Sequence, residues 1–282
     1  MNQTIQLSGF PGIPPFGLGT TGYWSGENPG LTACIREVID RYELTVLDTA
    51  EMYGEGRCEA ALGKAIRGIR RDRLFLVDKI LPGNANEKSF RQSLHASLQR
   101  LGTDYIDLYL LHWRENADLP YLVHTMESAV QEGLIRHWGV SNFDSADIKD
   151  LLMVPHGDRC FCNQVFFSVY ERGCEYELLP FLKAHHILPM SYSSLGSNFH
   201  SHPDIHKNQA VMKLCEAEGI TPEAMMLQWN AEHGFCALFS TSSVIHLREN
   251  LREIPEDVML RFHETIDREF PPPTHAYPMV KI

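Results

Sequence analysis

The feature that most restricts the fold of this 282-residue chain is a regular alternation of short apolar runs with amphipathic stretches. Several of the apolar runs are continuous, as is typical of strands buried on both faces of a parallel sheet. We predict strands at 16–20, 45–49, 74–79, 106–112, 135–141, 161–166, 187–193 and 236–241. Because strand and helix alternate eight times, the pattern predicts an α/β fold, a (β/α)8 barrel of the TIM type.

The stretches between these runs have the periodicity of helices. We expect helices at 31–42, 57–67, 87–101, 119–131, 145–152, 175–185 and 208–218. A further helix should begin at Thr221-Pro222-Glu223, with Thr as the N-cap and Pro at the first helical position. Gly102, Gly133 and Gly219 directly follow helical patterns, where a left-handed residue often ends a helix.

No linker divides the chain, because its Pro- and Gly-rich stretches lie only at 9–15 and 271–273. The length suits one barrel. We therefore expect residues 1–282 to form a single domain with a short C-terminal tail.

Charge and composition restrict the partners. The net charge is −11, from 25 basic and 36 acidic residues, and no long basic run occurs, so nucleic acid and anionic membranes are poor candidates. The sequence has no secretory signal and no apolar run near the ~20 residues of a membrane span. Seven scattered cysteines suit reduced thiols. We expect a cytoplasmic protein, a monomer or weak homodimer, that acts on a small molecule.

Titratable residues gather where the predicted strands end. Asp48 and Tyr53 follow the second strand, Lys79 ends the third and His112 ends the fourth. The C-terminal ends of barrel strands meet at one rim, where active sites lie. Because a buried charge is costly unless paired, Asp48 and Lys79 should pair, and the lysine charge should lower the pKa of the Tyr53 hydroxyl. A tyrosine hydroxyl beside a histidine can exchange a proton in carbonyl–alcohol interconversion.

These segments resemble those of the aldo-keto reductases. Asp-Thr-Ala-x-x-Tyr-Gly at 48–54 is similar to the family's signature, and Lys79 and His112 are similar to its catalytic lysine and histidine. Gly-Val-Ser-Asn-Phe, Asn-Gln-Val and Tyr-Ser-x-Leu-Gly are similar to its cofactor-binding segments. The motifs occur in the family's order over nearly the whole chain, which most resembles bacterial members of the methylglyoxal reductase type.

The resemblance implies an oxidoreductase that reduces small aldehydes or ketones, such as methylglyoxal-like dicarbonyls, with NAD(P)H. Hydride would pass from the nicotinamide to the carbonyl carbon, and Tyr53 would donate the proton. Lys79, held by Asp48, would favour the phenolate, and His112 would orient the carbonyl oxygen. NADPH is the expected cofactor, with NADH or dual use open.

The resemblance also implies which residues contact the ligands. The nicotinamide would stack on Tyr192, and its carboxamide would bind Ser141, Asn142 and Gln164. The expected cofactor-binding residues are Gly19, Thr20, Asp48, Ser141, Asn142, Gln164, Tyr192, Ser193, Leu195, Ser240, Thr241, Ser242, His246, Glu249 and Asn250. The expected substrate-pocket residues are Trp24, Tyr53, His112 and Trp113.

The chain departs from the family's pattern at the usual site of the NADP 2′-phosphate. Ser240 replaces a lysine and His246 replaces an arginine. Each lost cation removes charge-assisted hydrogen bonds of about 1.5–3 kcal/mol. Hydroxyl groups at a helix N-terminus can still bind a phosphate. The direction of Arg248, which is close in sequence, stays open.

Two smaller departures lie near the predicted site. Ser194 stands where the family usually has proline, which should loosen that loop. Asp78 precedes the lysine where serine is common. Alternation along the strand directs its side chain away from that of Lys79.

Other interpretations of single residues stay open. Ser141 and Asn142 could cap the following helix, Gln164 could be a hydrogen-bonding core residue, and Trp113 could be part of the core. At the level of function, a redox-sensing module on the same scaffold could bind the cofactor with little turnover. A set of four complete catalytic groups argues against that alternative.

A metal-dependent function has less support. A barrel hydrolase needs several ligands at strand ends, and only Asp48 and His112 qualify. The cluster His200, His202 and His206 has helical spacing for zinc, but Pro203 interrupts it and no cysteine pair accompanies it. We therefore expect no metal.

Overall fold

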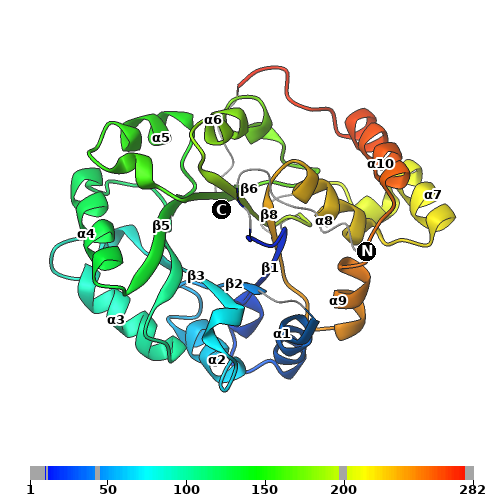
Figure 1. Ribbon diagram of the computed structural model, residues 1–282. Helices are drawn as coiled ribbons and strands as arrows, with labels where there is room; N and C mark the ends of the chain where they lie inside the picture. Colours follow the sequence, from blue (N-terminus) through cyan, green and yellow to red (C-terminus); the bar gives the residue numbers. More distant parts are fainter. Residues whose placement is uncertain (1–9, 11, 42–44, 197–201, 277–282) are drawn as a thin grey trace.

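The computed structural model describes residues 10, 12–41, 45–196 and 202–276. Eight parallel strands close into a barrel in chain order, and β8 returns to pair with β1 (Figure 1). They are β1 (Phe16–Gly19), β2 (Thr45–Asp48), β3 (Leu74–Ile80), β4 (Ile106–Leu111), β5 (Ile135–Ser141), β6 (Cys162–Phe166), β7 (Leu188–Tyr192) and β8 (Cys236–Phe239). The predicted (β/α)8 barrel is confirmed, and each strand ends within two residues of its predicted range.

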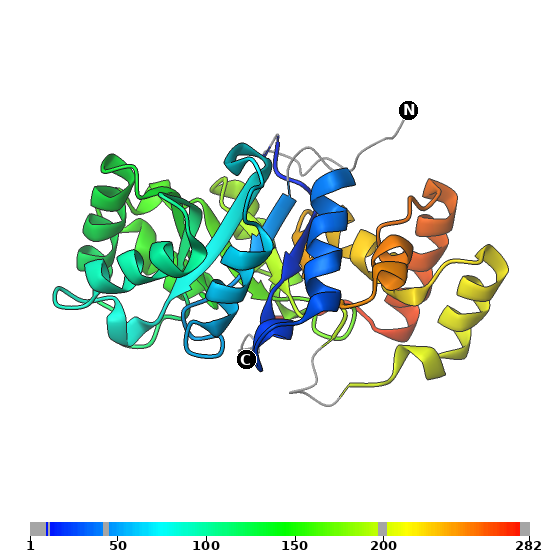
Figure 2. The same cartoon turned by 90° about the horizontal axis from the view of Figure 1, so that it is seen from below.

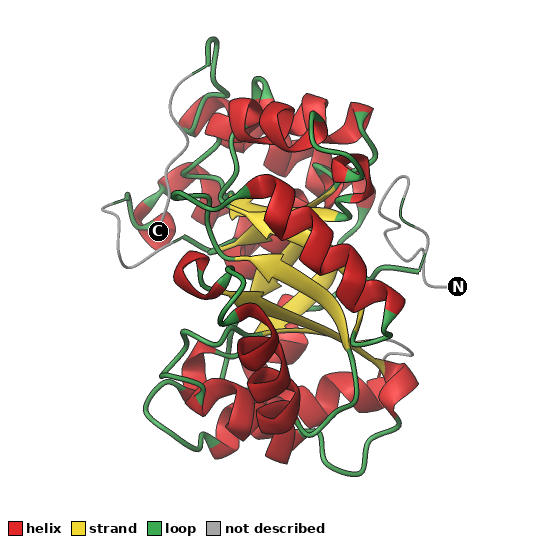
Figure 3. Ribbon diagram, turned by 90° about the vertical axis from the view of Figure 1, so that its left-hand side faces the viewer, coloured by secondary structure: helices red, strands yellow, loops and turns green. Residues whose placement is uncertain are grey.

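Helices lie above and below the strands in Figure 3, around the outside of the barrel. They are α1 (Pro29–Arg41), α2 (Arg57–Ala65), α3 (Phe90–Leu101), α4 (Leu119–Gln131), α5 (Ser145–Leu152), α6 (Leu178–Ala184), α7 (Gln209–Glu218), α8 (Pro222–Glu232), α9 (Val244–Asn250) and α10 (Glu256–Glu269). The last two were not predicted. Helix α10 packs beside α7 and α8 at one side of the barrel (Figure 2). No helix among the described residues has the length and apolar character to cross a membrane.

The helix ends follow from local chemistry. The Oγ1 atom of Thr221 accepts a hydrogen bond from the backbone N–H of Ala224, and Gly102 and Gly219 take left-handed conformations at the ends of α3 and α7. The helix expected at 175–185 instead begins at Leu178, after a 3₁₀ turn at Gly173–Glu175. Pro180 then lies in the first turn, where proline is tolerated.

Alternation along the strands separates two cores. Val46, Val77, Leu108 and their counterparts pack in the barrel interior, and the intervening residues pack against the helices. Because successive strand side chains point to opposite faces, every second residue along a strand faces the barrel interior, up to the C-terminal rim. The seven cysteines are free and buried, as expected for reduced thiols.

Candidate active site

Strand register and alternation bring four titratable side chains to the C-terminal rim. Asp48 lies two residues beyond the interior Val46, Lys79 two beyond Val77, and His112 directly follows β4. Neighbouring strands are hydrogen-bonded in parallel, so these residues reach the same end of the barrel. The structure therefore confirms the prediction that these residues meet at the C-terminal rim of the barrel.

Asp48 and Lys79 form a buried ion pair. The Nζ atom of Lys79 lies 2.7 Å and 2.8 Å from the two Asp48 carboxylate oxygens, and it also donates to the backbone oxygen of Thr49 at 2.9 Å. Burial opposes the lysine charge, but the Asp48 and Tyr53 side chains outweigh it and raise the pKa of Lys79. The predicted pairing is confirmed.

Tyr53 joins this pair, but its predicted pKa direction was wrong. Its hydroxyl oxygen lies 3.4 Å from Lys79 Nζ. Loss of solvent around the hydroxyl raises the pKa of Tyr53 by more than the Lys79 charge lowers it. The hydroxyl therefore keeps its proton at neutral pH in this structure.

His112 lies beside Tyr53 as a neutral imidazole. The two ring centroids are 5.8 Å apart. Burial, aided by the charge of Lys79, lowers the pKa of His112 to about 2. Its Nδ1 atom is buried and has no hydrogen-bond partner within the part of the chain that the structure describes.

A hydrogen-bond network ties the expected nicotinamide-binding residues to this centre. Gln164 Nε2 donates to Asp48 at 2.9 Å. Asn142 Nδ2 donates to the His112 backbone oxygen at 3.1 Å, and the Tyr192 hydroxyl donates to Asn142 Oδ1 at 2.6 Å. Gln164 thus contacts the ion pair directly, and Asn142 and Tyr192 connect to the centre through the His112 backbone.

The backbone near this network is strained at two positions. Asn142 and Ser193 have φ angles of 60° and 51°, a region that residues other than glycine rarely occupy. Such strain is often found at binding sites. Sequence inspection gave no sign of it.

The alternative role of Ser141 and Asn142 as helix caps is excluded. The cap of α5 is Asp144, whose carboxylate accepts from the backbone N–H groups of Ala146 and Asp147. The Ser141 hydroxyl instead donates to the Gln164 backbone oxygen at 2.8 Å.

The expectation that Ser194 loosens its loop stays a prediction, because residues 197–201 of that loop lie outside the described residues. Ser194 is fully buried, and its hydroxyl lies 3.0 Å from that of Ser191. Its backbone oxygen accepts a hydrogen bond from Asn230. The Ser194 hydroxyl thus makes hydrogen bonds with Ser191 that a proline at this position could not make.

Three expected cofactor contacts lie around the first and seventh strands. Gly19 ends β1 and lies in register with Asp48. The Thr20 backbone N–H donates to the Asp48 backbone oxygen at 3.0 Å, and its buried hydroxyl has no partner among the described residues. Leu195 packs at the edge of the core.

The expected adenosine end lies between β8 and α9. Ser240, Thr241 and Ser242 form the loop, and Ser243 caps α9 by accepting from the backbone N–H of His246. A side chain at Gly30 would meet the Ser242 backbone oxygen at 2.3 Å, so α1 packs closely against this loop.

Helix α9 presents its residues in two directions. His246, Glu249 and Asn250 are spaced along one face; the first two are exposed and Asn250 is buried. Arg248 points instead to α1, where its Nε lies 2.9 Å from a Glu37 carboxylate oxygen. It therefore does not replace the missing cations.

Aromatic residues flank the centre. The ring of Trp24 lies 6.1 Å from that of Tyr53, and the ring of Trp113 lies 4.5 Å from that of His112. Trp24 is 46% exposed. The Trp113 indole N–H donates to the carboxylate of Glu115, an acidic contact that the sequence analysis did not single out.

The metal hypothesis has no support from the described residues, which contain no group of three possible ligands. His206 pairs with Glu223 at 2.9 Å, and the His202 ring stacks on Tyr170 at 4.1 Å. His200 and the chain ends at 1–9 and 277–282 lie outside the described residues.

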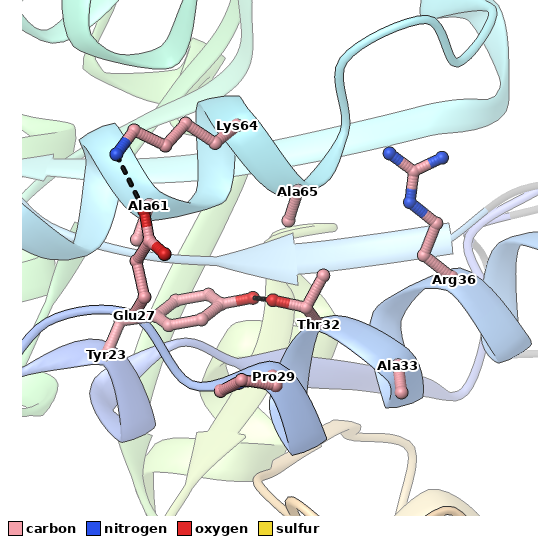
Figure 4. Close-up of a pocket in the computed structure, with 9 residues that line it drawn as sticks. All are labelled: Tyr23, Glu27, Pro29, Thr32, Ala33, Arg36, Ala61, Lys64 and Ala65. Atoms are coloured by element: carbon pink, nitrogen blue, oxygen red, sulfur yellow. Dashed lines mark hydrogen bonds and ion pairs between the residues drawn. The ribbon is translucent and has the colours of Figure 1, made fainter.

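A separate cleft of about 430 Å³ lies between α1 and α2, away from the expected site residues (Figure 4). Its two cationic side chains already have partners. Lys64 pairs with Glu27 at 2.8 Å, and Arg36 donates to the Arg67 backbone oxygen at 3.3 Å. None of the expected site residues lines this cleft.

Comparison with known proteins gives a consistent result. The profile of the Aldo/keto reductase family matches residues 16–264. Methylglyoxal reductase YeaE of Escherichia coli is 35% identical, with 96% of each chain covered. An aldo-keto reductase of Mycobacterium marinum is 30% identical, over 88% of this chain and 84% of that protein.

A solved structure has the same architecture. The crystal structure of an aldo/keto reductase from Klebsiella pneumoniae in complex with NADP and acetate matches with a TM-score of 0.86 and 34% identity, covering 96% of both chains. Profile, sequence relatives and architecture agree, and this chain belongs to the aldo/keto reductase family of oxidoreductases.

Proposed function

We propose that this protein reduces small aldehydes and ketones to alcohols with NADPH, with Tyr53 as the proton donor. The observation that carries the proposal is the Tyr53 hydroxyl 3.4 Å from an ammonium group that is itself held by Asp48, beside a neutral His112. This set combines a proton donor, a charge that stabilises its conjugate base and a group that can orient a carbonyl.

The protein's own residues divide the proton chemistry among them. NADPH, when bound, supplies the hydride. Tyr53 donates its proton as negative charge develops on the carbonyl oxygen, and Lys79 stabilises the phenolate that remains. Asp48 keeps Lys79 in place, and neutral His112 hydrogen-bonds the carbonyl oxygen. Assistance of this kind typically accelerates a reaction by ~10²–10⁴.

The residues at the nicotinamide end fit the cofactor. Tyr192 offers a ring for stacking, and Ser141, Asn142 and Gln164 offer amide and hydroxyl groups for the carboxamide. Asn142 bonds to Ser141 and Tyr192, and Ser141 bonds to the Gln164 backbone oxygen, so these groups already lie within hydrogen-bonding distance of one another. Thr20, whose backbone N–H donates to the Asp48 backbone oxygen, has a buried hydroxyl without a described partner and is a further polar group near the centre.

The adenosine end fits with fewer charges. Ser240, Thr241, Ser242 and the N-terminal end of α9 would hold the 2′-phosphate, with His246 beside them and Glu249 and Asn250 toward the adenine. The Klebsiella relative was crystallised with NADP, which favours NADPH. Because the two usual cations are missing, we expect weaker discrimination against NADH than a lysine and an arginine would provide.

Small dicarbonyls such as methylglyoxal are the proposed substrates. The name of the Escherichia coli relative supports this choice, and the aromatic walls from Trp24 and Trp113 suit a compact carbonyl compound. We further propose that the protein works in the cytoplasm as one domain spanning residues 1–282, and as a monomer or weak homodimer.

Turnover and binding, measured separately, test the proposal. NADPH consumption is followed with methylglyoxal and a panel of aldehydes, and cofactor binding is followed by protein fluorescence. Wild-type protein should consume NADPH steadily, and Y53F should lose this turnover while it binds NADPH with near wild-type affinity. Tight binding without turnover in the wild type would favour a redox-sensing role, and strong turnover in Y53F would exclude Tyr53 as the proton donor.

A further inference from the structure

A second cluster of buried titratable groups lies behind Lys79, on the opposite face of β3. It consists of Asp78 on β3, Glu59 on α2, Arg100 on α3 and Tyr109 on β4. Asp78, Glu59 and Tyr109 are completely buried. These three side chains are therefore shielded from water, whereas the Arg100 side chain is 30% exposed.

The hydrogen bonds in this cluster leave one carboxylate oxygen without a partner. Both oxygens of Glu59 accept from Arg100, at 2.7 Å and 3.1 Å. Asp78 Oδ1 accepts from the backbone N–H of Lys79 at 2.9 Å. Asp78 Oδ2 is buried and has no donor among the described residues. A buried carboxylate oxygen without a donor is costly.

The charges around Asp78 do not balance if both carboxyl groups are ionised. Arg100 is already engaged by Glu59, and the Lys79 ammonium is engaged by Asp48 on the other face of the strand. The other titratable groups near the cluster are Glu51, Cys58 and Arg57, and the cation among them, Arg57, is exposed and already donates to the Trp24 backbone oxygen.

A proton on Asp78 removes both problems at once. It neutralises the excess negative charge, and it turns the unpartnered oxygen into a donor. Glu59 lies close enough for a hydrogen bond between the two side chains. In agreement, burial and then the charge of Glu59 raise the pKa of Asp78 well above its usual range.

We propose that Asp78 is a positioning residue that holds a proton in the folded protein, shares it with Glu59, and fixes the backbone of the catalytic-site lysine through Oδ1. The carboxyl group supports Lys79 from the helix side without adding a second negative charge next to it. The Lys79 ammonium then remains available to Asp48 and Tyr53. This role goes beyond the proposed reduction, because the shared proton exists whether or not a substrate is turned over.

The sign of the pH dependence follows from the raised pKa. Below the usual aspartate pKa the group is protonated in both folded and unfolded chains. Above it, only the folded protein retains this proton until the raised pKa is passed. The free energy of unfolding of the wild type therefore falls as pH rises through that interval, compared with that of a variant whose side chain at position 78 is always neutral.

Asp78→Asn provides a close mimic of the protonated acid. Its amide oxygen can accept from the Lys79 N–H and its NH₂ group can donate to Glu59, with no proton to lose. Urea unfolding of wild type, D78N and the surface control D40N is measured from about pH 5 to about pH 9. D78N should gain stability relative to wild type as pH rises, while D40N should not. A difference between D78N and wild type that stays constant with pH, or a wild type that gains relative to D78N, would overturn the proposal.

Infrared spectroscopy reads the proton directly. The folded wild type near neutral pH should show the carbonyl band of a buried protonated carboxylic acid, and D78N should lack it. Its absence from the wild type would show that Asp78 is ionised and would contradict the proposal. Neither this measurement nor the unfolding series depends on turnover, so a failure here is distinct from a failure of the proposed function.

Replacement by alanine tests the positioning role itself, and this arm rests on the proposed function. D78A removes the acceptor for the Lys79 N–H, so kcat should fall about tenfold while NADP⁺ affinity stays near wild type. D78N restores the acceptor and should recover most of that loss. Equal kcat values for D78A and D78N would show that the Oδ1 contact does not position Lys79.

Discussion

The Nζ atom of Lys79 lies within 2.8 Å of both carboxylate oxygens of Asp48, and the two side chains are almost completely buried. Removing one member of such a pair leaves an uncompensated charge in the protein interior. Asp48→Asn should therefore lower the free energy of unfolding by about 3–5 kcal/mol, in addition to reducing turnover.

Urea unfolding at neutral pH measures this loss. The control is Asp40→Asn on the exposed face of α1, which should change the free energy of unfolding by less than about 0.5 kcal/mol. Similar unfolding curves for D48N and wild type would mean that the pair does not stabilise the native state.

The buried His112 should lower the free energy of unfolding as the pH falls. Its pKa is lowered to about 2 by burial and by Lys79, so the folded protein stays unprotonated there while the unfolded chain binds a proton below about pH 6.5. The stability lost between about pH 8 and about pH 5 from this group alone is ~2 kcal/mol.

His112→Gln should remove this part of the acid sensitivity. Unfolding of both proteins across that pH interval gives the difference. The exposed His246→Gln serves as the matched control, since it lies outside the buried centre. If His112 stays neutral, the pH profile of kcat/KM should contain no His112 titration between about pH 5 and about pH 8. The profiles of wild type and His112→Gln should therefore have the same shape over that interval.

Restoring a cation at the expected 2′-phosphate site should strengthen NADP⁺ binding selectively. His246→Arg and Ser240→Lys each introduce a charge-assisted contact of about 1.5–3 kcal/mol, which corresponds to roughly 10- to 150-fold in Kd. NAD⁺ lacks the phosphate and should bind these variants as it binds wild type. Fluorescence titration of both cofactors measures the ratio.

Arg248→Ala is the informative control for that experiment. Its guanidinium faces Glu37, so its removal should leave NADP⁺ affinity almost unchanged. A large loss of NADP⁺ affinity in R248A would mean that Arg248 leaves Glu37 to bind the phosphate.

Glu115 should disfavour substrates that carry a carboxylate. Its side chain accepts the Trp113 indole N–H, and the Trp113 ring lies 4.5 Å from His112, so a negative charge stands beside the expected pocket. Glu115→Gln keeps an acceptor for the indole and removes the charge. The kcat/KM ratio of 4-carboxybenzaldehyde to 4-nitrobenzaldehyde should rise by about twofold, because Glu115 is exposed and solvent and salt screen much of its charge.

The exposed Glu264→Gln on α10 tests whether overall charge causes the effect. An equal rise in both variants would assign the change to net charge instead of the pocket. No rise in E115Q would show that the Glu115 carboxylate does not influence the substrate.

The order of strands, the barrel closure and the rim residues could be predicted from the sequence because they depend on periodicity. Val46 and Asp48 share a face of β2 at a spacing of two residues, as Val77 and Lys79 do on β3. Such spacings are local, so they are readable before the chain is folded. The pairing of Asp48 with Lys79 followed from the cost of leaving either charge buried alone.

Only the tertiary structure decided how these groups are tuned. The pKa of Tyr53 depends on how much solvent the surrounding elements exclude. The direction of the Arg248 side chain depends on Glu37, which lies on a helix more than two hundred residues away in the chain. The proton proposed for Asp78 depends on the packing of α2 and α3 against it. Burial and charge pairing are properties of packed elements, and residue spacing alone contains no information about their distances. Periodicity therefore determined where the polar side chains lie, and packing determined which of them carry charge.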